Sequence, residues 1–385
     1  MKDLKIALIG NMNNNFFVLA RYLRDEGFNC GVFALPYEPA HFSANSDSNS
    51  EEDIQLVQVL PWGNAQDLFS LSPNTINAQF EEYNFFIACG TAPAFLTKAG
   101  IAVDLFIPYG SDLYLLPFAI PKNPLKWLSN LHFRKFQKRG IKGAAAVSIA
   151  DNATVFQNAL NKIGFKGLVL KSGVPMVYAP HKIKHEVFSK EDEVPKKRIK
   201  ILHPSRHAWK TEKDPVSLKD NNKLFEGVAL FITNHPSIEV IVYTMEYGSD
   251  INASKELIAE LGIERNVKWF PTMARKDLMS LYHEVDIVVG ELRNSWFTYG
   301  VIYEAMVAAK PVIHYRKDDL YTDLKLYPMY SASSAQQVCD RLSEYAENPQ
   351  NGNRIGYEAR SWYFEECVQK VIVDIEGLLK RKLQG

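Results

Sequence analysis

Short apolar runs alternate with amphipathic segments along this chain. Near its beginning, residues 5–9 (KIALI), 30–34 (CGVFA) and 85–89 (FFIAC) are apolar and too short for buried helices, which predicts buried strands. Residues 16–26 (FFVLARYLRDE) place apolar side chains at helical spacing and are followed by Gly27, a residue that commonly ends helices. A strand, a helix and a second strand joined by short connections predict a parallel sheet.

Polar turns follow these predicted strands. The sequence GNMNNN follows the first strand, and glycine-bearing loops follow the strands expected at 85–89 and 104–108. The carboxyl ends of parallel strands meet at one edge of a sheet, where open α/β sheets bind their ligands. GNMNNN lacks the glycine spacing of a dinucleotide-binding loop. The residues expected to line a cleft at this edge are Gly10, Asn11, Asn13, Asn14 and Asp112.

A purely structural role for these residues stays open. Asparagine caps helices and tolerates left-handed turns, so GNMNNN could serve only to start the following helix. Asp112 could likewise be a helix cap. Residues 43–53 are polar and acidic and predict a surface loop. The first α/β domain is expected to span residues 1–175, and the highly charged residues 176–198 predict an interdomain linker.

A second α/β pattern occupies residues 199–359. It opens with an apolar strand at 199–202 (IKIL) and continues with alternating helices and strands. Its clearest unit runs from Asp286 to Tyr315 and contains an apolar strand, a polar loop, a helix at 301–309 and another apolar strand. Pro311 follows the helix and cannot continue it. This order predicts a second parallel sheet.

Three charged residues follow strands of the second sheet. Arg206 follows the strand at 199–202, Lys219 precedes the next helix, and Glu304 lies near the start of the helix at 301–309. Two cations beside a helix amino terminus form an anion site, for which a diphosphate is a natural occupant. Taken singly, each cation could be a surface charge, and Glu304 could simply complement the helix dipole.

Composition fits a globular protein of two domains. The chain has 385 residues, a length too great for one ordinary core. Of these residues, 46% are hydrophobic and 23% are charged. Lys+Arg and Asp+Glu each number 44, so no net charge attracts nucleic acid, and no nucleic-acid partner is expected. The sequence shows no long apolar run and no signal peptide, which predicts a cytoplasmic location. The four cysteines lack CxxC spacing and predict neither zinc nor disulfides.

One segment departs from this neutral background, because residues 113–150 contain no acidic side chain. Lysines and arginines alternate there with Trp127, Leu128 and other apolar residues. A basic segment with aromatic residues can lie on an anionic bilayer, where each Lys or Arg contributes about 1 kcal/mol. The sequence predicts peripheral membrane contact through residues 121–143. A solvated helix and a patch for an anionic substrate are the alternatives.

Two segments of the second half resemble the nucleotide-sugar domain of retaining GT-B glycosyltransferases of family 4. They are NVKWFPTMARKDLMSLYHEVDIVV and YGVIYEAMVAAKPVI, the second matching a helix and strand built on glycine, Glu-Ala-Met and Lys-Pro-Val-Ile. The strand before Arg206 and the later lysine form the other half of the pattern. The resemblance covers residues 199–375 well and the first 175 loosely. It implies two Rossmann-like domains whose parallel sheets face across a cleft, and a final helix, 360–385, packed on the first domain.

The resemblance also implies roles for residues at matching positions. Glu304 resembles the glutamate that binds the ribose hydroxyls of the donor. Arg206 resembles the arginine on the diphosphate, and Lys219 resembles its lysine partner. Tyr299 and Gly300 lie where backbone N–H groups meet the phosphates. The first domain is implied to bind the acceptor.

Two positions leave this comparison open. Lys210 and Lys213 are rivals of Lys219, because an insertion between strand and helix obscures the correspondence. Trp296 stands where the family has another glutamate, eight residues before the second one. Glu291 is the candidate replacement, so the identity of the donor sugar is not predicted.

The expected chemistry follows from the same residues. No D-x-D sequence is present, so no metal and no cofactor beyond the nucleotide sugar are expected. Arg206 and the lysine would stabilise the charge of the leaving nucleoside diphosphate, whose oxygen takes the acceptor's proton with retention of configuration. Asp112 or a histidine acting as base would instead imply inversion. His41, His132 and His203 are interpreted as surface or capping residues.

Three functional hypotheses result. The first is a hexosyltransferase that uses a nucleotide sugar to extend a glycan or lipid-linked acceptor in cell-surface polysaccharide synthesis. The second is a nucleotide-sugar epimerase of the same fold, which would need catalytic acids and bases that the sequence does not reveal. The third is a non-catalytic nucleotide-sugar-binding module, for which Trp296 in place of glutamate is the indication.

Overall fold

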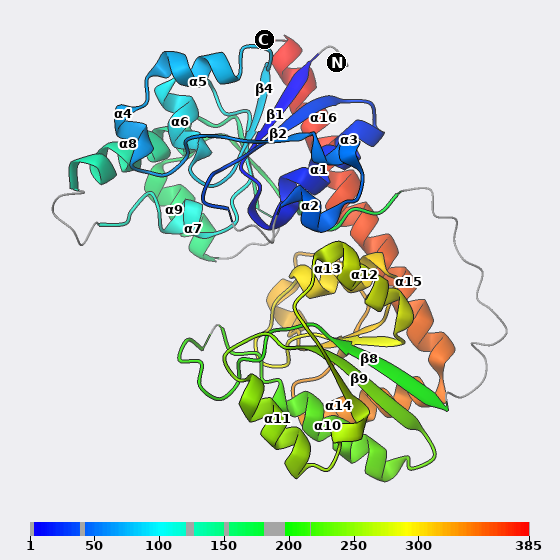
Figure 1. Ribbon diagram of the computed structural model, residues 1–385. Helices are drawn as coiled ribbons and strands as arrows, with labels where there is room; N and C mark the ends of the chain where they lie inside the picture. The colour runs from blue at the N-terminus through cyan, green and yellow to red at the C-terminus, as the bar shows by residue number, and fades with distance from the viewer. Residues whose placement is uncertain are drawn as a thin grey trace. The chain divides into compact units, whose positions relative to one another are not determined.

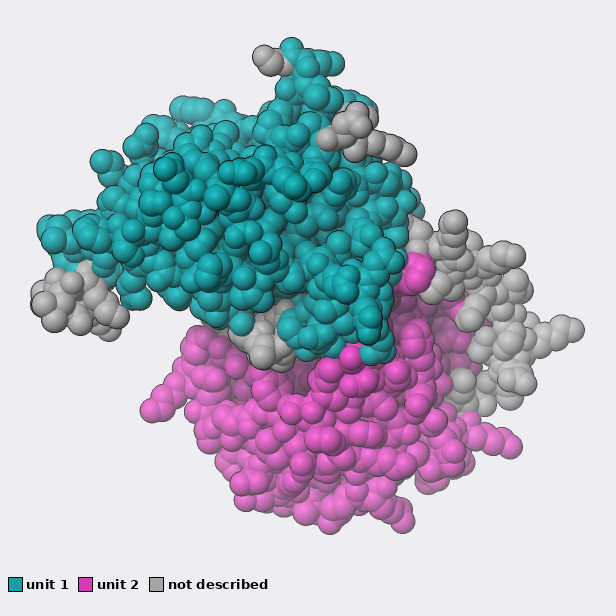
Figure 2. Space-filling model, turned by 45° about the horizontal axis from the view of Figure 1, so that its top comes forward, with its two compact units in different colours: residues 1–178, 364–385 teal, residues 179–363 magenta. Residues whose placement is uncertain are grey.

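The chain forms two compact units (Figure 1, Figure 2). Unit 1 comprises Met1–Tyr178 with Phe364–Gly385, and unit 2 comprises Ala179–Tyr363. Of the predicted linker at 176–198, residues 181–196 lie outside the described residues. The computed structural model describes residues 4–38, 43–120, 127–149, 154–180, 197–215 and 217–384.

Unit 1 contains a seven-stranded parallel sheet in the order β3-β2-β1-β4-β5-β6-β7. Its strands are β1 (Lys5–Ile9), β2 (Asn29–Ala34), β3 (Val57–Val59), β4 (Phe85–Ala88), β5 (Leu105–Phe106), β6 (Ala146–Ser148) and β7 (Leu168–Leu170). Its helices include α1 (Asn15–Asp25), α2 (Ala44–Asp47), α3 (Glu51–Ile54), α4 (Asp67–Ser70), α5 (Pro73–Gln79), α6 (Ala92–Lys98), α7 (Ser111–Tyr114), α8 (Trp127–Gly143), α9 (Thr154–Ile163) and α16 (Lys370–Gln384).

The first βαβ unit is confirmed as β1, α1 and β2. In the centre of the sheet, Ile6 of β1 pairs with Cys30 of β2 and with Phe85 of β4. Ile6 to Ile9 are all buried, as in parallel sheets whose two faces are covered. The predicted surface loop at 43–53 is wrong in part, because α2 and α3 form there. The Ser50 hydroxyl accepts the Asp53 N–H and so caps α3.

Unit 2 contains a six-stranded parallel sheet in the order β10-β9-β8-β11-β12-β13. Its strands are β8 (Arg198–His203), β9 (Glu239–Met245), β10 (Val267–Phe270), β11 (Ile287–Val289), β12 (Val312–His314) and β13 (Tyr330–Ser331). Its helices include α10 (Asn222–Asn234), α11 (Ile251–Glu260), α12 (Arg275–Glu284), α13 (Gly300–Val307), α14 (Ala335–Glu347) and α15 (Pro349–Tyr363).

The predicted strand-loop-helix-strand unit at 286–315 is present as β11, α13 and β12. Helix α13 ends at Val307, and Ala309 just beyond it adopts a left-handed conformation (φ 55°), with its N–H bonded to the Met306 carbonyl at 2.9 Å. Gly356 of α15 packs against this turn, and a Cβ atom there would lie 2.2 Å from the Ala309 carbonyl oxygen. The close approach therefore requires glycine at 356.

The carboxyl-terminal helical run passes from unit 2 to unit 1. It starts at Pro349 rather than at residue 360, and a π-helical turn at Phe364–Gln369 joins α15 to α16. On α16, the Lys382 ammonium lies 2.7 and 2.8 Å from the two carboxylate oxygens of Asp104. This ion pair ties the end of the chain to the residue that precedes β5.

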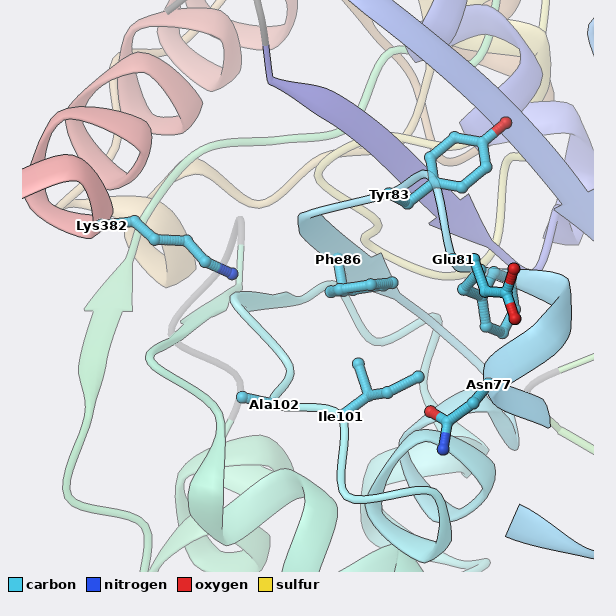
Figure 3. A pocket seen from close by; sticks show the side chains of 8 residues that line it. Asn77, Glu81, Tyr83, Phe86, Ile101, Ala102 and Lys382 are labelled. Atoms are coloured by element: carbon cyan, nitrogen blue, oxygen red, sulfur yellow. The ribbon is translucent and has the colours of Figure 1, made fainter. Parts of the chain in front are cut away.

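A pocket of about 400 Å³ lies beside this ion pair, and Figure 3 shows Lys382 reaching toward Phe86 and Ala102. Phe86 lies in β4, while Glu81 and Tyr83 precede that strand and Ala102 precedes β5. The pocket is therefore near the amino ends of the strands. Ligands of parallel sheets bind at the opposite edge, where the polar loops lie.

Candidate functional site

The strand order reverses once in each sheet, and this reversal locates a candidate site. In unit 2, β8 and β11 are neighbours, with β9 and β10 on one side and β12 and β13 on the other. Ligands of open α/β sheets bind outside the carboxyl ends of the strands at such a switch point. The loops there are 204–221 after β8 and 290–299 after β11. These loops contain most of the predicted donor-site residues.

Lys219 and Glu291 join the two loops across the switch point. The Lys219 ammonium donates to Oε1 of Glu291 in an ion pair in which both side chains are largely buried. The Glu291 backbone N–H donates to the Tyr299 hydroxyl at 2.6 Å. That hydroxyl occupies the space next to Gly290, where a Cβ atom would lie 2.2 Å away. The predicted residues Lys219, Glu291 and Tyr299 are therefore brought together.

Arg206 lies half-buried in the loop after β8. One of its terminal nitrogens donates to the Ser217 carbonyl oxygen at 3.3 Å. The Asn221 side-chain amide holds the backbone of the same loop, since it donates to the Arg206 carbonyl at 3.2 Å and accepts from the Ala208 N–H at 3.0 Å. The rival lysines, Lys210 and Lys213, are exposed in the same loop.

A buried histidine supports this arrangement. His203 is fully buried, so its interpretation as a surface or capping residue is wrong. Its Nδ1 lies 2.8 Å from the Val289 carbonyl of β11, and its Nε2 lies 2.8 Å from the Asn221 amide nitrogen. Burial lowers the pKa of His203 to about 4, against the raising effect of the Val289 carbonyl. The neutral ring donates from Nδ1 and accepts at Nε2, which links β8, β11 and the Arg206 loop.

Glu304 is a buried member of a network between α12 and α13. The Arg275 guanidinium lies 3.0 Å from its Oε1, and the Tyr282 hydroxyl donates to its Oε2 at 2.8 Å. Sequence reasoning missed both partners. Arg275 and Tyr282 are seven residues apart on α12, a spacing that places two side chains on the same face of a helix. Gly300 is the first residue of α13, and the Tyr299 carbonyl before it accepts the N–H groups of Ile302 at 3.0 Å and Tyr303 at 3.2 Å.

In unit 1, the strand order reverses between β1 and β4. Gly10 follows β1 with a φ of 96°, and a Cβ atom there would lie 2.4 Å from the Cys89 sulfur. Asn11 is buried, and its side-chain oxygen accepts the Phe17 N–H of the first turn of α1 at 2.9 Å. Asn14 is also buried and left-handed (φ 60°), and its amide donates to the Ser43 carbonyl at 2.9 Å.

The two remaining predicted residues of this edge, Asn13 and Asp112, differ in exposure. Asn13 adopts a left-handed conformation (φ 55°) and is partly exposed. Asp112 is fully buried, and its carboxylate accepts the N–H groups of Gly90 at 2.8 Å and Gly110 at 3.0 Å. Burial raises the pKa of Asp112 to about 7, and these backbone N–H groups oppose the shift. Asp112 therefore joins the loops after β4 and β5.

Glu38 is a residue of this edge that sequence reasoning missed. It lies in the loop after β2, and its Oε1 accepts the Asn11 N–H at 2.5 Å. Its Oε2 is buried without a hydrogen-bond partner in the described structure. Burial raises the pKa of Glu38 to about 7. A single glutamate in a polar loop gave no sequence signal of this position.

The described residues contain no group of three or more His, Cys, Asp or Glu side chains arranged to hold a metal ion. The cations in the loops at the unit 2 switch point include Arg206, Lys219 and Arg293, the last paired with Asp220 at 3.2 Å.

No protein-family model matches the chain, and no curated protein sequence matches it. Solved structures do match. HepE from Anabaena, in complex with UDP and glucose, gives a TM-score of 0.57 over 99% of both chains at 16% identity. A glycosyltransferase from Rickettsia africae gives 0.58 over 100% of this chain and 98% of its own, at 17% identity. Sucrose-phosphate synthase from Thermosynechococcus elongatus gives 0.55 over 99% of both chains at 14% identity. This protein has the GT-B fold.

The GT-B fold is the class that the sequence resemblance implied. Its two parallel sheets, each with one switch point, are those of unit 1 and unit 2. At these identities the similarity shows the fold alone, and the ligands and substrates of the similar proteins cannot be assigned to this chain from it.

Proposed function

We propose that this protein is a retaining glycosyltransferase of the family 4 type, which transfers a hexose from a nucleotide sugar to a glycan or lipid-linked acceptor. We propose that the enzyme works in the cytoplasm and that its product is used in the synthesis of cell-surface polysaccharide. The observation that carries the proposal is that Arg206 and Lys219 lie in the loop after β8, and that Lys219 pairs with Glu291 of the loop that leads into α13. Two cations and the backbone N–H groups at a helix start suit a diphosphate.

In this proposal, the donor binds to unit 2 with its ribose on Glu304. Arg275 and Tyr282 hold the Glu304 carboxylate in place, and a carboxylate can accept further hydrogen bonds from ribose hydroxyls. Arg206 and Lys219 stabilise the negative charge that develops on the leaving diphosphate, so no metal is required for that step. A phosphate oxygen takes the proton of the acceptor hydroxyl on the same face of the sugar.

The donor sugar is proposed to contact Glu291. Its Oε2 is buried and has no hydrogen-bond partner in the described structure, whereas its Oε1 is held by Lys219. A sugar hydroxyl donating to Oε2 would satisfy this oxygen. Unit 1 is proposed to bind the acceptor at its own switch point. Glu38, whose Oε2 has no partner among the described residues, and the partly exposed Asn13 are the polar groups of that edge best suited to contact it. The side chains of Asn11, Asn14 and Asp112 are buried and hydrogen-bonded within unit 1.

Binding and turnover of UDP-glucose test the proposal. A ligand at 100 times its dissociation constant should stabilise the protein by about 2.7 kcal/mol, which a thermal-shift assay detects. We expect stabilisation by UDP-glucose or by a GDP sugar, and slow release of free sugar into water. Binding without turnover, with acceptors supplied, would favour the non-catalytic module. Release of a 2-epimer would favour the epimerase. The absence of any nucleotide binding would contradict all three hypotheses.

We also propose that α8 brings unit 1 to an anionic membrane. Leu128, which is 70% exposed, shares one outward face of α8 with Lys135, Arg139 and Lys142. Trp127 at the start of the helix is 50% exposed. An apolar end followed by a row of cations suits a helix lying in the interface of an anionic bilayer. None of the helices in the described ranges is long and apolar enough to cross a bilayer.

Vesicle co-sedimentation tests the membrane proposal. Binding should be stronger to phosphatidylglycerol vesicles than to phosphatidylcholine vesicles and should weaken with salt. Changing Lys135, Arg139 and Lys142 to glutamine should weaken binding by about 100-fold, at about 1 kcal/mol for each charge. The control is the same change at three exposed cations of α16, which are Lys370, Lys380 and Arg381. The control variant should lose less binding than the α8 variant. Equal binding of both triple variants would contradict a role for α8.

A further inference from the structure

Ser205 is a buried residue whose hydroxyl has no hydrogen-bond partner in the described structure. It directly follows Pro204 at the end of β8 and precedes Arg206. The residue is 6% exposed, and its Oγ is among the buried polar atoms without a partner. Buried hydroxyls are nearly always paired, because an unpaired one loses its hydrogen bonds to water and gains nothing.

The other buried serines of the described chain show the ordinary arrangement. Ser148 and Ser172 bond to each other at 2.8 Å, and the Ser254 hydroxyl lies 2.8 Å from Nδ1 of His207. Ser48 donates to a carboxylate oxygen of Asp53 at 3.1 Å. Ser205 is the exception among them, and it is the one that lies in the switch-point loop of unit 2.

Ser205 lies in one of the two loops that leave the switch point of unit 2, and Glu291 lies in the other. Leu202 of β8 pairs with Val288 of β11, and the next residue, His203, contacts the Val289 carbonyl. Ser205 and Glu291 each follow the paired position of Leu202 and Val288 by three residues, in the two loops that leave the switch point. Each of these loops therefore carries a buried polar atom without a partner in the described structure, Oγ of Ser205 and Oε2 of Glu291.

The chemistry of this position favours a phosphate oxygen as the missing partner of Ser205. A serine hydroxyl donates one hydrogen bond, and no hydrogen bond in the described structure fixes the rotamer of Ser205, so its hydroxyl can turn toward a ligand. The neighbouring Arg206 provides positive charge for an anion. A hydroxyl donating to an ionised phosphate makes a charge-assisted bond, which is stronger than a bond between neutral groups.

We propose that the Ser205 hydroxyl donates a hydrogen bond to a phosphate oxygen of the nucleoside diphosphate. This inference rests on the proposed function, because it assigns a further ligand to the same donor site. Ser205 is left without a partner in the free protein and gains one when the diphosphate binds. The hydroxyl therefore contributes to binding and not to the stability of the free fold.

This assignment predicts effects of opposite kinds on stability and on binding. Ser205→Ala removes an unpaired buried hydroxyl, so the melting temperature of the free protein should stay unchanged or rise. The dissociation constant of UDP, measured by titration calorimetry, should increase about 10- to 100-fold, the usual range for a hydrogen bond to a charged group. The dissociation constant of uridine, which carries no phosphate, should not change.

Ser148→Ala is the matched control. It removes a buried and paired serine hydroxyl of β6 in unit 1, so it should lower the melting temperature and leave UDP affinity unchanged. A Ser205→Ala protein with wild-type UDP affinity would overturn the inference. A lower melting temperature in that variant would also overturn it, because the hydroxyl would then have a structural role.

The uridine measurement separates phosphate from nucleoside contact, since equal losses for uridine and UDP would overturn the phosphate assignment. If the wild-type protein binds UDP and the variant binds it equally well, only this inference fails. If the wild-type protein binds neither UDP nor GDP, the proposed function fails and the inference fails with it.

Discussion

Changing Arg206 to alanine should lower sugar transfer from UDP-glucose by about 100- to 1000-fold, by analogy with the loss of one oxyanion-stabilising donor. The physical reason is that the leaving diphosphate gains negative charge in the transition state, and a preorganised cation stabilises that charge. The Arg206 side chain makes one hydrogen bond within the described structure, to the Ser217 carbonyl, so truncating it to alanine should spare the fold. Initial rates and a thermal melt of the same preparation check both expectations.

Arg198→Ala is the control for this experiment. Arg198 lies at the opposite end of β8, where its exposed guanidinium pairs with Glu239 at 2.6 Å. Exposed pairs contribute about 0 to 1 kcal/mol to stability, so this variant should fold and turn over normally. Normal turnover of the Arg206 variant would refute the assignment of the donor site to unit 2.

Changing Lys219 to methionine should both destabilise the protein and weaken diphosphate binding. Without the ammonium, Glu291 is left as a largely buried carboxylate without its cation. Removing one partner of a buried pair costs about 3 kcal/mol, an effect that chemical denaturation can measure. The loss of a cation from the proposed phosphate site weakens UDP binding separately.

A double variant distinguishes these two effects. Lys219→Met combined with Glu291→Gln removes both charges, so most of the lost stability should return because neither charge is left unpaired. Weak UDP binding should persist in the double variant, because the phosphate cation is still missing. Recovery of UDP affinity together with stability would show that Lys219 only supports Glu291, and Lys210 or Lys213 would become the phosphate lysine.

The path of the backbone was largely predictable from the sequence. The apolar run at 5–9 and the helix ending before Pro311 are local features, because burial periodicity and proline geometry act within a few residues. The segment at 43–53 was predicted less well. Its short helices depend on one capping hydroxyl, that of Ser50, and on packing that composition does not record.

The candidate site was predictable in outline and not in its internal contacts. The order of strands was enough to predict Arg206, Lys219 and Glu304 at one sheet edge. It did not reveal that Glu304 is held by Arg275 and Tyr282, or that Glu38 approaches Asn11. These contacts join residues far apart in the chain, so no spacing rule contains them.

The sequence alone determined that this protein is α/β, that its sheets are parallel, and that charged residues follow the strands of the second one. Those features come from local preferences and from the period of apolar residues. Only the tertiary structure decided which polar side chains are buried and hydrogen-bonded within the protein. Asp112 and His203 are buried and paired, whereas Ser205 is buried and unpaired. The reason is that hydrogen-bond pairing depends on distances across the sheet edge, which are fixed only when the whole unit packs.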